Sequence, residues 1–484
     1  MKRKSLKVNA ALNGIKSILS LLFPLITFPY VSRVLGANGI GIYNFSNSIV
    51  SYFILIAGLG VNTYAVREGA KYRDNFNKIS KFSSEVFSIN LVSTLIAYIL
   101  LLLSLIVFSN LRNYFVCIAI FSLQIFFTTI GTEWIYTIFE DYAYITLRSI
   151  AFNIISVILL FLFVRSKNDY LQYAAITVFA AVGSNVFNYI HAKKMVSIKF
   201  SWHLNLKCHL KPILIIFASS VAVMIYVNSD ITLLGIMKNS YVVGIYSVSA
   251  KIYSIVKSVI TALLVVTVPR LALLWGQHRF KEYKMILSDV INNLIILVLP
   301  CMVGLIMLSK EVILIISGKG FLRAQSSLQI LCVALVFSLF GWIISDCVLI
   351  PAKREKKFFY ATCISAIVNI LINFLFIPSL AENAAAVSTV IAECSMMLMN
   401  LYYSWDIVND IFRSKSFYRN LFSSVIGCIG IIFVCYMSDL EWRSLFFKIV
   451  FSVTLSVIIY GAILIALDNN VAKKVLQNLK NIKH

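Results

Sequence analysis

The chain has 484 residues, of which 60% are hydrophobic and only 13% are charged, whereas a soluble domain carries about 25% charged residues. With a mean hydropathy of +0.88, it has too few polar groups to cover a water-facing surface, so soluble enzyme folds are excluded and a polytopic membrane protein is predicted. The net charge of +23 indicates basic loops that fix membrane orientation, and it requires no nucleic-acid partner.

The hydrophobic segments predict an all-α integral membrane protein with about fourteen transmembrane helices. A helix needs about 20 apolar residues to cross the hydrocarbon of a bilayer. Segments of this kind lie at 10–32, 40–64, 82–108, 114–138, 144–164, 170–190, 212–236, 241–268, 290–308, 326–350, 358–377, 384–403, 417–437 and 444–467. The basic N-terminus precedes an apolar run that has no small-residue cleavage site, so this run is expected to remain as the first helix.

The charges of the loops predict the orientation. With the N-terminus in the cytoplasm, the cytoplasmic segments hold 30 Lys and Arg and the external loops hold 9. This bias follows the positive-inside rule and favours a multi-pass protein of the bacterial cytoplasmic membrane. Because the number of helices is even, both termini are expected on the cytoplasmic side.

An internal repeat is visible in the sequence. GIYNFSNSIVS begins at Gly41 and GIYSVSAKIYS begins at Gly244, and at the same offset of 203 Arg67 falls on Arg270. Each copy contains six helices, so the copies are parallel, an architecture in which transporters place the substrate path between two bundles. We expect six-helix lobes at 1–200 and 201–403, followed by two additional helices and a cytoplasmic tail at 404–484.

Constellations for catalysis or metal binding are nearly absent. Ser317-Gly318-Lys319-Gly320 lacks the upstream glycine of a phosphate-binding loop, because position 313 is Ile. The nine cysteines form no CxxC pair and are expected to be free, mostly buried thiols. The five histidines fall in predicted loops or the tail without metal-ligand spacing, and we expect them to be solvated. No enzyme activity, cofactor or metal is predicted.

Polar residues within the bilayer are costly and therefore informative. One stripe with helical spacing runs along the segment 241–268 and consists of Ser247, Lys251, Ser254 and Ser258. Lys257 lies on the edge of this stripe. The matching segment of the first repeat carries Asn44, Ser48 and Ser51 at equivalent positions. Lys251 lies too deep for easy snorkelling, so it is expected either to face a wet substrate path or to form a structural ion pair. The Ser and Asn positions also fit close helix packing.

Other charged residues complete the candidate site. The candidate cationic residues of the substrate path are Lys251 and Lys257 together with Lys16, Arg33, Arg67 and Arg270. Snorkelling to the cytoplasmic surface competes with a path role for Lys16. Asp230 and Glu133 are the candidate acidic residues, which could neutralise a lysine or titrate during transport. Glu393 and Asp346 are weaker acidic candidates.

The run FPLITFPYVSRVLGANGIGIYNFSNSIVSYFILIAGLGVNTYAVREGA at 23–70 resembles the opening of Wzx-type polysaccharide flippases. These proteins belong to the multidrug/oligosaccharidyl-lipid/polysaccharide exporter superfamily. EWIYTIFEDYAYITLRSI at 133–150, NDYLQYAAI at 168–176 and SDITLLGIMKNSYVVGIYSVSAKIYSIVKSVI at 229–260 are also similar.

The resemblance implies ion-coupled, alternating-access transport of an undecaprenyl-diphosphate-linked oligosaccharide repeat unit to the external leaflet, for O-antigen or capsule assembly. It also implies membrane lipid, a polysaccharide polymerase and a chain-length regulator as partners. Lysines on polar stripes suit a diphosphate, because they offset the cost of moving phosphate through a medium of low dielectric constant.

Two other functions compete with this interpretation. A multidrug or cation antiporter of the same superfamily favours acidic and aromatic path residues, but the deepest charges here are Lys251 and Lys257. An integral-membrane polysaccharide polymerase or glycosyltransferase needs sizeable hydrophilic loops with catalytic side chains. The longest predicted external loop is too short for that role.

Overall fold

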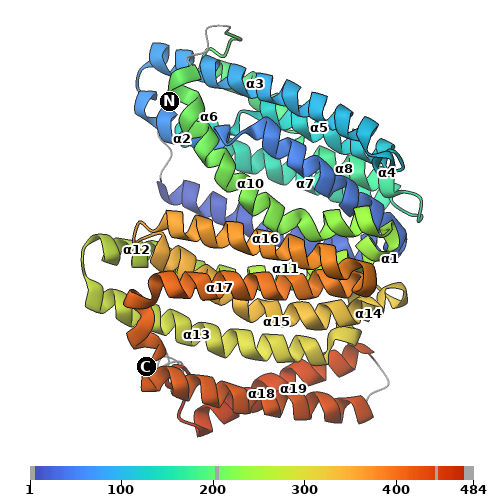
Figure 1. Cartoon of the computed structure of the whole chain (residues 1–484), viewed down its shortest axis with the longest axis vertical. Helices are drawn as coiled ribbons and strands as arrows, with labels where there is room; N and C mark the ends of the chain where they lie inside the picture. Colours follow the sequence, from blue (N-terminus) through green and yellow to red (C-terminus); the bar gives the residue numbers. More distant parts are fainter. Residues whose placement is uncertain (1–5, 202–205, 442–444, 474–484) are drawn as a thin grey trace. The chain divides into compact units, whose positions relative to one another are not determined.

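The computed structural model describes residues 6–201, 206–441 and 445–473, and the side chains of residues 6–22, 207 and 439–441 lie outside this description. Within the described residues every regular element is a helix (Figure 1), which confirms the all-α prediction. The chain forms two compact units, residues 1–244 and 245–484. The predicted lobe boundaries at 200 and 403 remain predictions.

The first unit is built on a long helix, α1, against which α3, α5, α7 and α10 pack. Its helices are α1 (Leu6–Gly58), α2 (Val61–Gly69), α3 (Phe76–Val107), α4 (Ser109–Arg112), α5 (Phe115–Gly131), α6 (Glu133–Ile138), α7 (Tyr142–Phe163), α8 (Tyr170–Val182), α9 (Asn185–Met195) and α10 (Leu206–Met237).

The second unit is centred on α17, which packs along both α15 and α16, while α18 and α19 pair with each other and α18 contacts α13. Its helices are α11 (Ser240–Leu264, which begins in the first unit), α12 (Val268–Gly276), α13 (Phe280–Met307), α14 (Ser309–Ile316), α15 (Ala324–Ile343), α16 (Glu355–Leu380), α17 (Glu382–Phe412), α18 (Lys415–Glu441) and α19 (Leu445–Ala466). A turn of π-helix, Ile344–Leu349, extends α15.

Thirteen stretches of the described chain are long and apolar enough to cross a membrane. The first of them contains a break in α1 at Gly36, whose φ of 67° and ψ of −179° are not helical. Only glycine adopts such a conformation at low cost, because any Cβ would be strained there. The predicted segment 10–32 thus lies in the first arm of α1, and the segment 40–64 covers most of the second arm and continues into α2. Counting the two arms separately accounts for the fourteen predicted helices.

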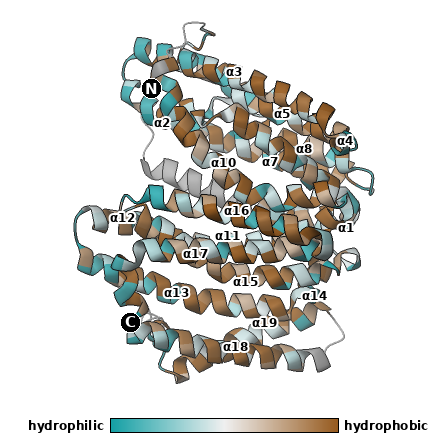
Figure 2. Cartoon of the chain, viewed as in Figure 1, coloured by the Kyte–Doolittle hydropathy of each residue, from teal (hydrophilic) through white to brown (hydrophobic). Residues whose placement is uncertain are grey.

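The exposed faces of individual helices are apolar, as expected of surfaces that contact lipid. On α3 the exposed apolar side chains recur every three or four residues, at Leu95, Ile99, Leu102 and Ile106, with 48–64% of each side chain exposed. The opposite face of α3 is buried and carries small polar residues such as Ser83 and Ser93. Hydrophobic residues fill the middle of the long helices and hydrophilic ones gather at their ends (Figure 2). Apolar residues on the exposed face and small polar residues on the buried face are the reverse of the pattern in a soluble protein. This arrangement is expected where hydrocarbon surrounds the helices.

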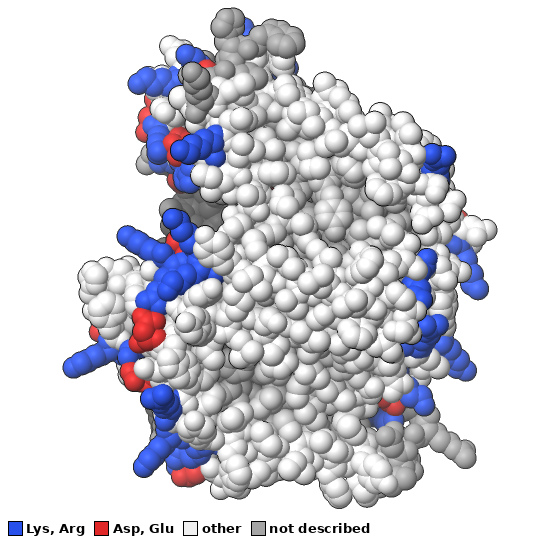
Figure 3. Space-filling model, viewed as in Figure 1, with Lys and Arg blue, Asp and Glu red and all other residues white. Residues whose placement is uncertain are grey.

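The charged residues have the complementary distribution. On the face drawn in Figure 3, Lys and Arg side chains gather over the ends of the helices and the broad middle of each unit is without them. The ends of α2, α9, α12 and the start of α16 carry many of these cations. An uncharged band bordered by basic helix ends is the arrangement expected of a membrane protein with polarised loops.

The two glycines that begin the repeated motif lie at one close crossing of backbones. A Cβ on Gly41 would lie 1.7 Å from the carbonyl oxygen of Ser240, and a Cβ on Gly244 would lie 1.9 Å from that of Ala37. Positions 37 and 240 are related by the same offset of 203 as the two glycines. Each glycine therefore approaches the backbone four residues before the other glycine, and the two contacts are reciprocal.

Candidate functional site

The predicted stripe on α11 is accessible along most of its length. Lys251 and Ser258 are half-buried and Ser254 is exposed, whereas Ser247 is buried. The hydroxyl of Ser254 donates to the Lys251 carbonyl at 2.9 Å and that of Ser258 to the Ser254 carbonyl at 2.7 Å. Because the helix satisfies these two hydroxyls, the ammonium group of Lys251 is the stripe's main feature for binding a ligand.

Lys251 has no carboxylate partner among the described residues of its own unit. A charged side chain at this depth in a membrane-spanning helix is costly unless it meets water, a counter-ion or a ligand. Lys251 is thus a half-buried cation that lies one helical turn from the exposed Ser254.

Lys257 differs from Lys251 because it is paired. Its Nζ lies 3.1 Å from Oε1 of the buried Glu393 on α17, and the Tyr253 hydroxyl donates to the same oxygen at 3.4 Å. The Lys257 ammonium also lies 5.7 Å from the centre of the Tyr253 ring. This cluster neutralises the charge of Lys257 and joins α11 to α17. It gives Glu393, a weaker candidate from the sequence, a clear structural partner.

The corresponding stripe in α1 takes part in packing. Asn44 and Ser51 are half-buried, and their side chains donate to the carbonyls of Ile40 and Asn47. Ser48 is buried and accepts a hydrogen bond of 3.3 Å from Thr232 on α10.

The α10 side of this packing also contains the candidate acid Asp230. Thr232 in turn lies 3.2 Å from the Tyr52 hydroxyl, and Asp230 is buried on the same helix. Part of the polar face predicted on α1 therefore joins α1 to α10 through Ser48 and Thr232.

The remaining candidate cations lie on other helices. Arg33 is exposed on α1 just before the break at Gly36. Arg67 is exposed on α2 and pairs with Glu68 at 3.2 Å, and Arg270 is exposed on α12. The side chain of Lys16 lies outside the described residues. Since α2 and α12 are both nine residues long, Arg67 and Arg270 also occupy equivalent short helices.

Glu133 lies at a polar pocket inside the first unit. The pocket has a volume of about 180 Å³ and is lined by Gly58, Asn62, Asn90, Thr128, Thr132, Glu133, Trp134, Ala181, Val182 and Asn185. Glu133 itself is exposed, and the structure shows no ion pair for it among the described residues. The sequence identifies this carboxylate, but the pocket depends on residues brought together from seven helices.

Two histidines are not solvated, contrary to the prediction. His209 is buried on α10, where Nδ1 lies 2.6 Å from the Tyr64 hydroxyl and Nε2 lies 2.9 Å from Glu85. His191 stacks on Tyr144, with ring centres 4.2 Å apart. The prediction is wrong for these two residues because α9 and α10 continue beyond the apolar segments that define them in the sequence.

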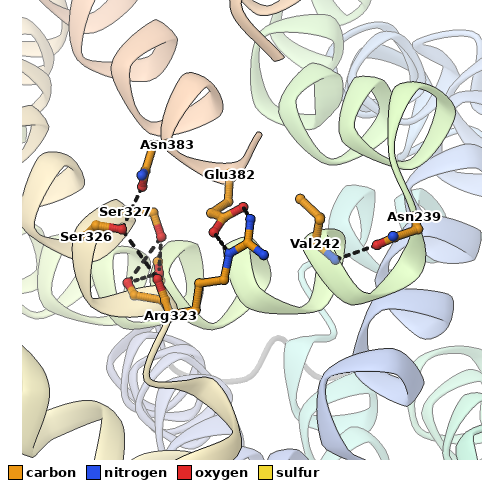
Figure 4. A network of polar contacts seen from close by, with 9 residues as sticks. Asn239, Val242, Arg323, Ser326, Ser327, Glu382 and Asn383 are labelled. Carbon is orange, nitrogen blue, oxygen red and sulfur yellow. Dashed lines mark hydrogen bonds and ion pairs between the residues drawn. The ribbon is translucent and has the colours of Figure 1, made fainter. Parts of the chain in front are cut away.

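Two ion pairs in the second unit have structural roles that sequence reasoning did not identify. The buried Lys448 of α19 pairs with the buried Glu311 of α14 at 2.6 Å. Arg323, just before α15, faces Glu382 at the start of α17, with Nη2 donating to Oε2 at 3.0 Å (Figure 4). Both pairs join helix ends that are distant in sequence.

These features define a polytopic membrane transporter, with polar stripes on helices whose outer faces are apolar and without a constellation for catalysis in the described residues. The family model of the polysaccharide biosynthesis proteins matches residues 6–275. The chain belongs to this family, which confirms the resemblance to Wzx-type flippases.

The relatives are also transport proteins. A protein of Escherichia coli (strain K12) named for O-antigen transport is 23% identical over 387 residues, which cover 78% of this chain and 92% of that protein. A Haloferax volcanii protein named as a low-salt glycan biosynthesis flippase is 23% identical over 215 residues, 44% of this chain and 45% of that protein. Neither is an enzyme, in agreement with the prediction.

Solved structures show the same fold. The lipid II flippase MurJ in an inward closed conformation has a TM-score of 0.76 and 16% identity, covering 97% of this chain and 99% of that one. An inward-facing multidrug resistance transporter of the MATE family has a TM-score of 0.62 and 15% identity, covering 81% and 96%. At these identities the likeness concerns the fold alone.

Proposed function

We propose that this protein is a flippase that moves an undecaprenyl-diphosphate-linked oligosaccharide repeat unit from the cytoplasmic to the external leaflet, for assembly of a surface polysaccharide such as O-antigen or capsule. The observation that carries the proposal is the family match over residues 6–275. The names of the relatives point to the same class of cargo. Lys251 on α11, which is half-buried and has no carboxylate partner among the described residues of its unit, is the chemical feature that fits the diphosphate group.

The physical requirements of this cargo agree with the observed surfaces. The glycan is hydrophilic and needs a polar route, while a polyprenyl tail can stay in lipid against exposed apolar helix faces such as that of α3. The diphosphate is anionic, and an ammonium group compensates the loss of its hydration. We propose that transport proceeds by alternating access and is coupled to an ion, with Asp230 and Glu133 as the candidate coupling acids.

We further propose that the protein resides in the bacterial cytoplasmic (inner) membrane with both termini in the cytoplasm, and that its repeats form lobes near 1–200 and 201–403. The excess of Lys and Arg in the predicted cytoplasmic segments supports this orientation. A polysaccharide polymerase and a chain-length regulator are the proposed partners, because a flipped repeat unit must be joined to others at the external face.

A multidrug or cation antiporter is the second candidate, favoured by the MATE-like fold. The two functions differ in the charge of the cargo that moves along the transport route. On α11 the cation Lys251 has no carboxylate partner among the described residues of its unit, and a route for cationic drugs would be opposed by such a charge. We therefore favour the anionic cargo.

Deleting the protein tests the proposed function directly. Lipid-linked repeat units should accumulate on the cytoplasmic face and the surface polymer should disappear, while synthesis of the unit continues. Single units accumulating on the external face would place the defect in polymerisation and contradict the proposal. Unchanged polymer together with increased drug sensitivity would support the antiporter instead.

A further inference from the structure

Positive charge is concentrated where α16 begins and α17 ends. The loop 351–357 holds four Lys and Arg and one acid, whereas the equivalent loop of the predicted first repeat, 139–149, holds one cation and two acids. The stretch 404–419, which ends α17 and begins α18, adds three cations and two acids. Basic loops orient membrane proteins in general. That effect alone does not require this corner of the second unit to be so much more basic than its counterpart.

The acids at the end of α17 are already paired. The guanidinium of Arg354 donates to both carboxylate oxygens of Asp406 at 2.7 and 2.6 Å, and also to the Tyr403 carbonyl at 2.7 Å. Lys284 of α13 pairs with Asp410 at 2.5 Å. These bonds fix the start of α16 against the end of α17, and the two helices pack side by side (Figure 1). The other cations of the corner are therefore not neutralised by these two acids.

Three of the other cations are exposed and available to an anion. Nζ of Lys357 lies 5.6 Å from the centre of the Tyr403 ring, and the guanidinium carbon of Arg413 lies 5.9 Å from the centre of the Trp405 ring. Lys356 forms no ion pair with the described residues, and all three cationic side chains are exposed. A cation held over an aromatic ring keeps its charge, because the ring does not neutralise it.

Exposed apolar stripes lead from these cations along both helices. On α16 the exposed side chains recur every three or four residues: Tyr360, Ile364, Ile367, Leu371 and Phe374.

The stripe on α17 has the same spacing and includes Leu398, Tyr402 and Trp405, and 78% of Tyr402 is exposed. Each stripe ends in an exposed Tyr or Trp near a Lys or Arg. This is the order of side chains expected where a transmembrane helix leaves the hydrocarbon and enters the headgroup region.

These groups match the parts of an anionic glycerophospholipid. Apolar side chains suit its acyl chains, Tyr and Trp suit its glycerol and ester groups, and Lys and Arg suit its phosphate. Basic pockets between transmembrane helices bind acidic headgroups in this way. A zwitterionic headgroup carries its own cation beside the phosphate, so the excess of positive charge favours a headgroup with net negative charge. An acidic soluble protein would leave the apolar stripes unused.

We propose that the corner formed by the start of α16 and the end of α17 is a binding site for an anionic glycerophospholipid such as phosphatidylglycerol. Lys356, Lys357 and Arg413 hold the phosphate, and Tyr360 and Trp405 lie at the level of the glycerol. The lipid belongs to the leaflet that the loop charges predict to be cytoplasmic. The site binds a lipid of the surrounding bilayer and not the cargo, so it does not depend on the proposed function.

Quenching of tryptophan fluorescence by brominated lipids tests this site with purified full-length protein. The protein is reconstituted into phosphatidylcholine vesicles that contain increasing fractions of either brominated phosphatidylglycerol or brominated phosphatidylcholine. The difference between the wild type and Trp405→Phe gives the signal of Trp405. We expect phosphatidylglycerol to quench this signal at a mole fraction about fivefold lower than phosphatidylcholine does. Salt at about 0.5 M should reduce the preference by screening the charges.

Charge-removing variants locate the lipid. The combined substitution Lys356→Gln, Lys357→Gln and Arg413→Gln should abolish the preference for phosphatidylglycerol and leave quenching by phosphatidylcholine unchanged. Lys356→Gln alone, at an exposed side chain without an ion pair, should lower the preference about twofold, and it provides the test if the triple variant fails to fold.

A matched control removes the same amount of charge from exposed positions in the first unit, and it should keep the full preference at Trp405: Lys193→Gln, Lys194→Gln and Lys199→Gln. The proposal is overturned if both lipids quench the wild type equally, if the triple variant at the corner keeps the preference, or if the control loses it as well. Farnesyl diphosphate is the competing probe. If it relieves the quenching of Trp405, the corner binds isoprenoid diphosphates and the assignment to a bilayer phospholipid is wrong. No transport is measured, so these results are independent of the flippase assignment.

Discussion

Lys251 differs from Lys257 and Lys448 because the latter two have carboxylate partners at 3.1 Å and 2.6 Å. If Lys251 attracts an anionic cargo, Lys251→Ala should abolish or greatly reduce polymer export at near-normal protein levels. Lys251→Arg should retain more activity because the charge survives. Lys281→Ala, at an exposed position on α13, is the control. Surface polymer and membrane abundance are measured together.

The alternative for Lys251 is a structural ion pair. In that case Lys251→Ala would lower abundance by leaving an acid unpaired, and also neutralising that acid would restore it. Normal export by a stably inserted Lys251→Ala protein would rule out a cationic role in transport at this position. The two explanations therefore predict opposite changes in protein level.

The buried pair of Lys448 and Glu311 gives a stability prediction. Only 11% of the Lys448 side chain and 8% of the Glu311 side chain are exposed, so removing one partner leaves an uncompensated charge and should cost about 3–5 kcal/mol. Lys448→Met should lower the melting temperature of the purified protein. Lys448→Met combined with Glu311→Leu should recover most of the loss. Lys310→Met, at the exposed neighbouring position, should have little effect; equal losses in the single and double variants would contradict the argument.

At the scale of elements, the crossing of Gly41 and Gly244 requires the absence of side chains. A Cβ at Gly41 would overlap the Ser240 carbonyl, so Gly41→Ala should push the two backbones apart and destabilise the unit by roughly 1–3 kcal/mol. Gly244→Ala should act in the same way because its contact is reciprocal. Gly58→Ala is the control, because a Cβ at this position would have no other atom within 4 Å. Thermal stability and export are compared, and wild-type values for both substitutions would show that the crossing is not tight.

The sequence predicts the long helices well because the requirement to cross hydrocarbon imposes a length and a composition on each of them. It does not reveal that α5 stops at Thr132, since the segment 114–138 remains apolar across the break. It also does not locate His209, because burial there depends on Tyr64 and Glu85 from two other helices. Periodicity identifies polar faces such as that of Lys251, whereas pairing, as between Lys257 and Glu393, depends on tertiary contacts.

At the scale of the whole molecule, the orientation predicted from the loop charges can be tested without knowing the cargo. Insertion places basic segments in the cytoplasm, and the split of 30 cytoplasmic to 9 external Lys and Arg is large. Reporter fusions after Lys199 and after Lys356 should therefore behave as cytoplasmic, and a fusion near Asp439 as external. Alkaline phosphatase and a fluorescent protein that folds in the cytoplasm provide opposite readouts at each position. An external signal at Lys199 would reverse the predicted orientation of the protein and place the exposed Arg67 and Arg270 on the external side. Cargo that binds from the cytoplasm would then not meet Arg67 and Arg270 first. The orientation therefore determines which charged residues can act when cargo is bound and which when it is released.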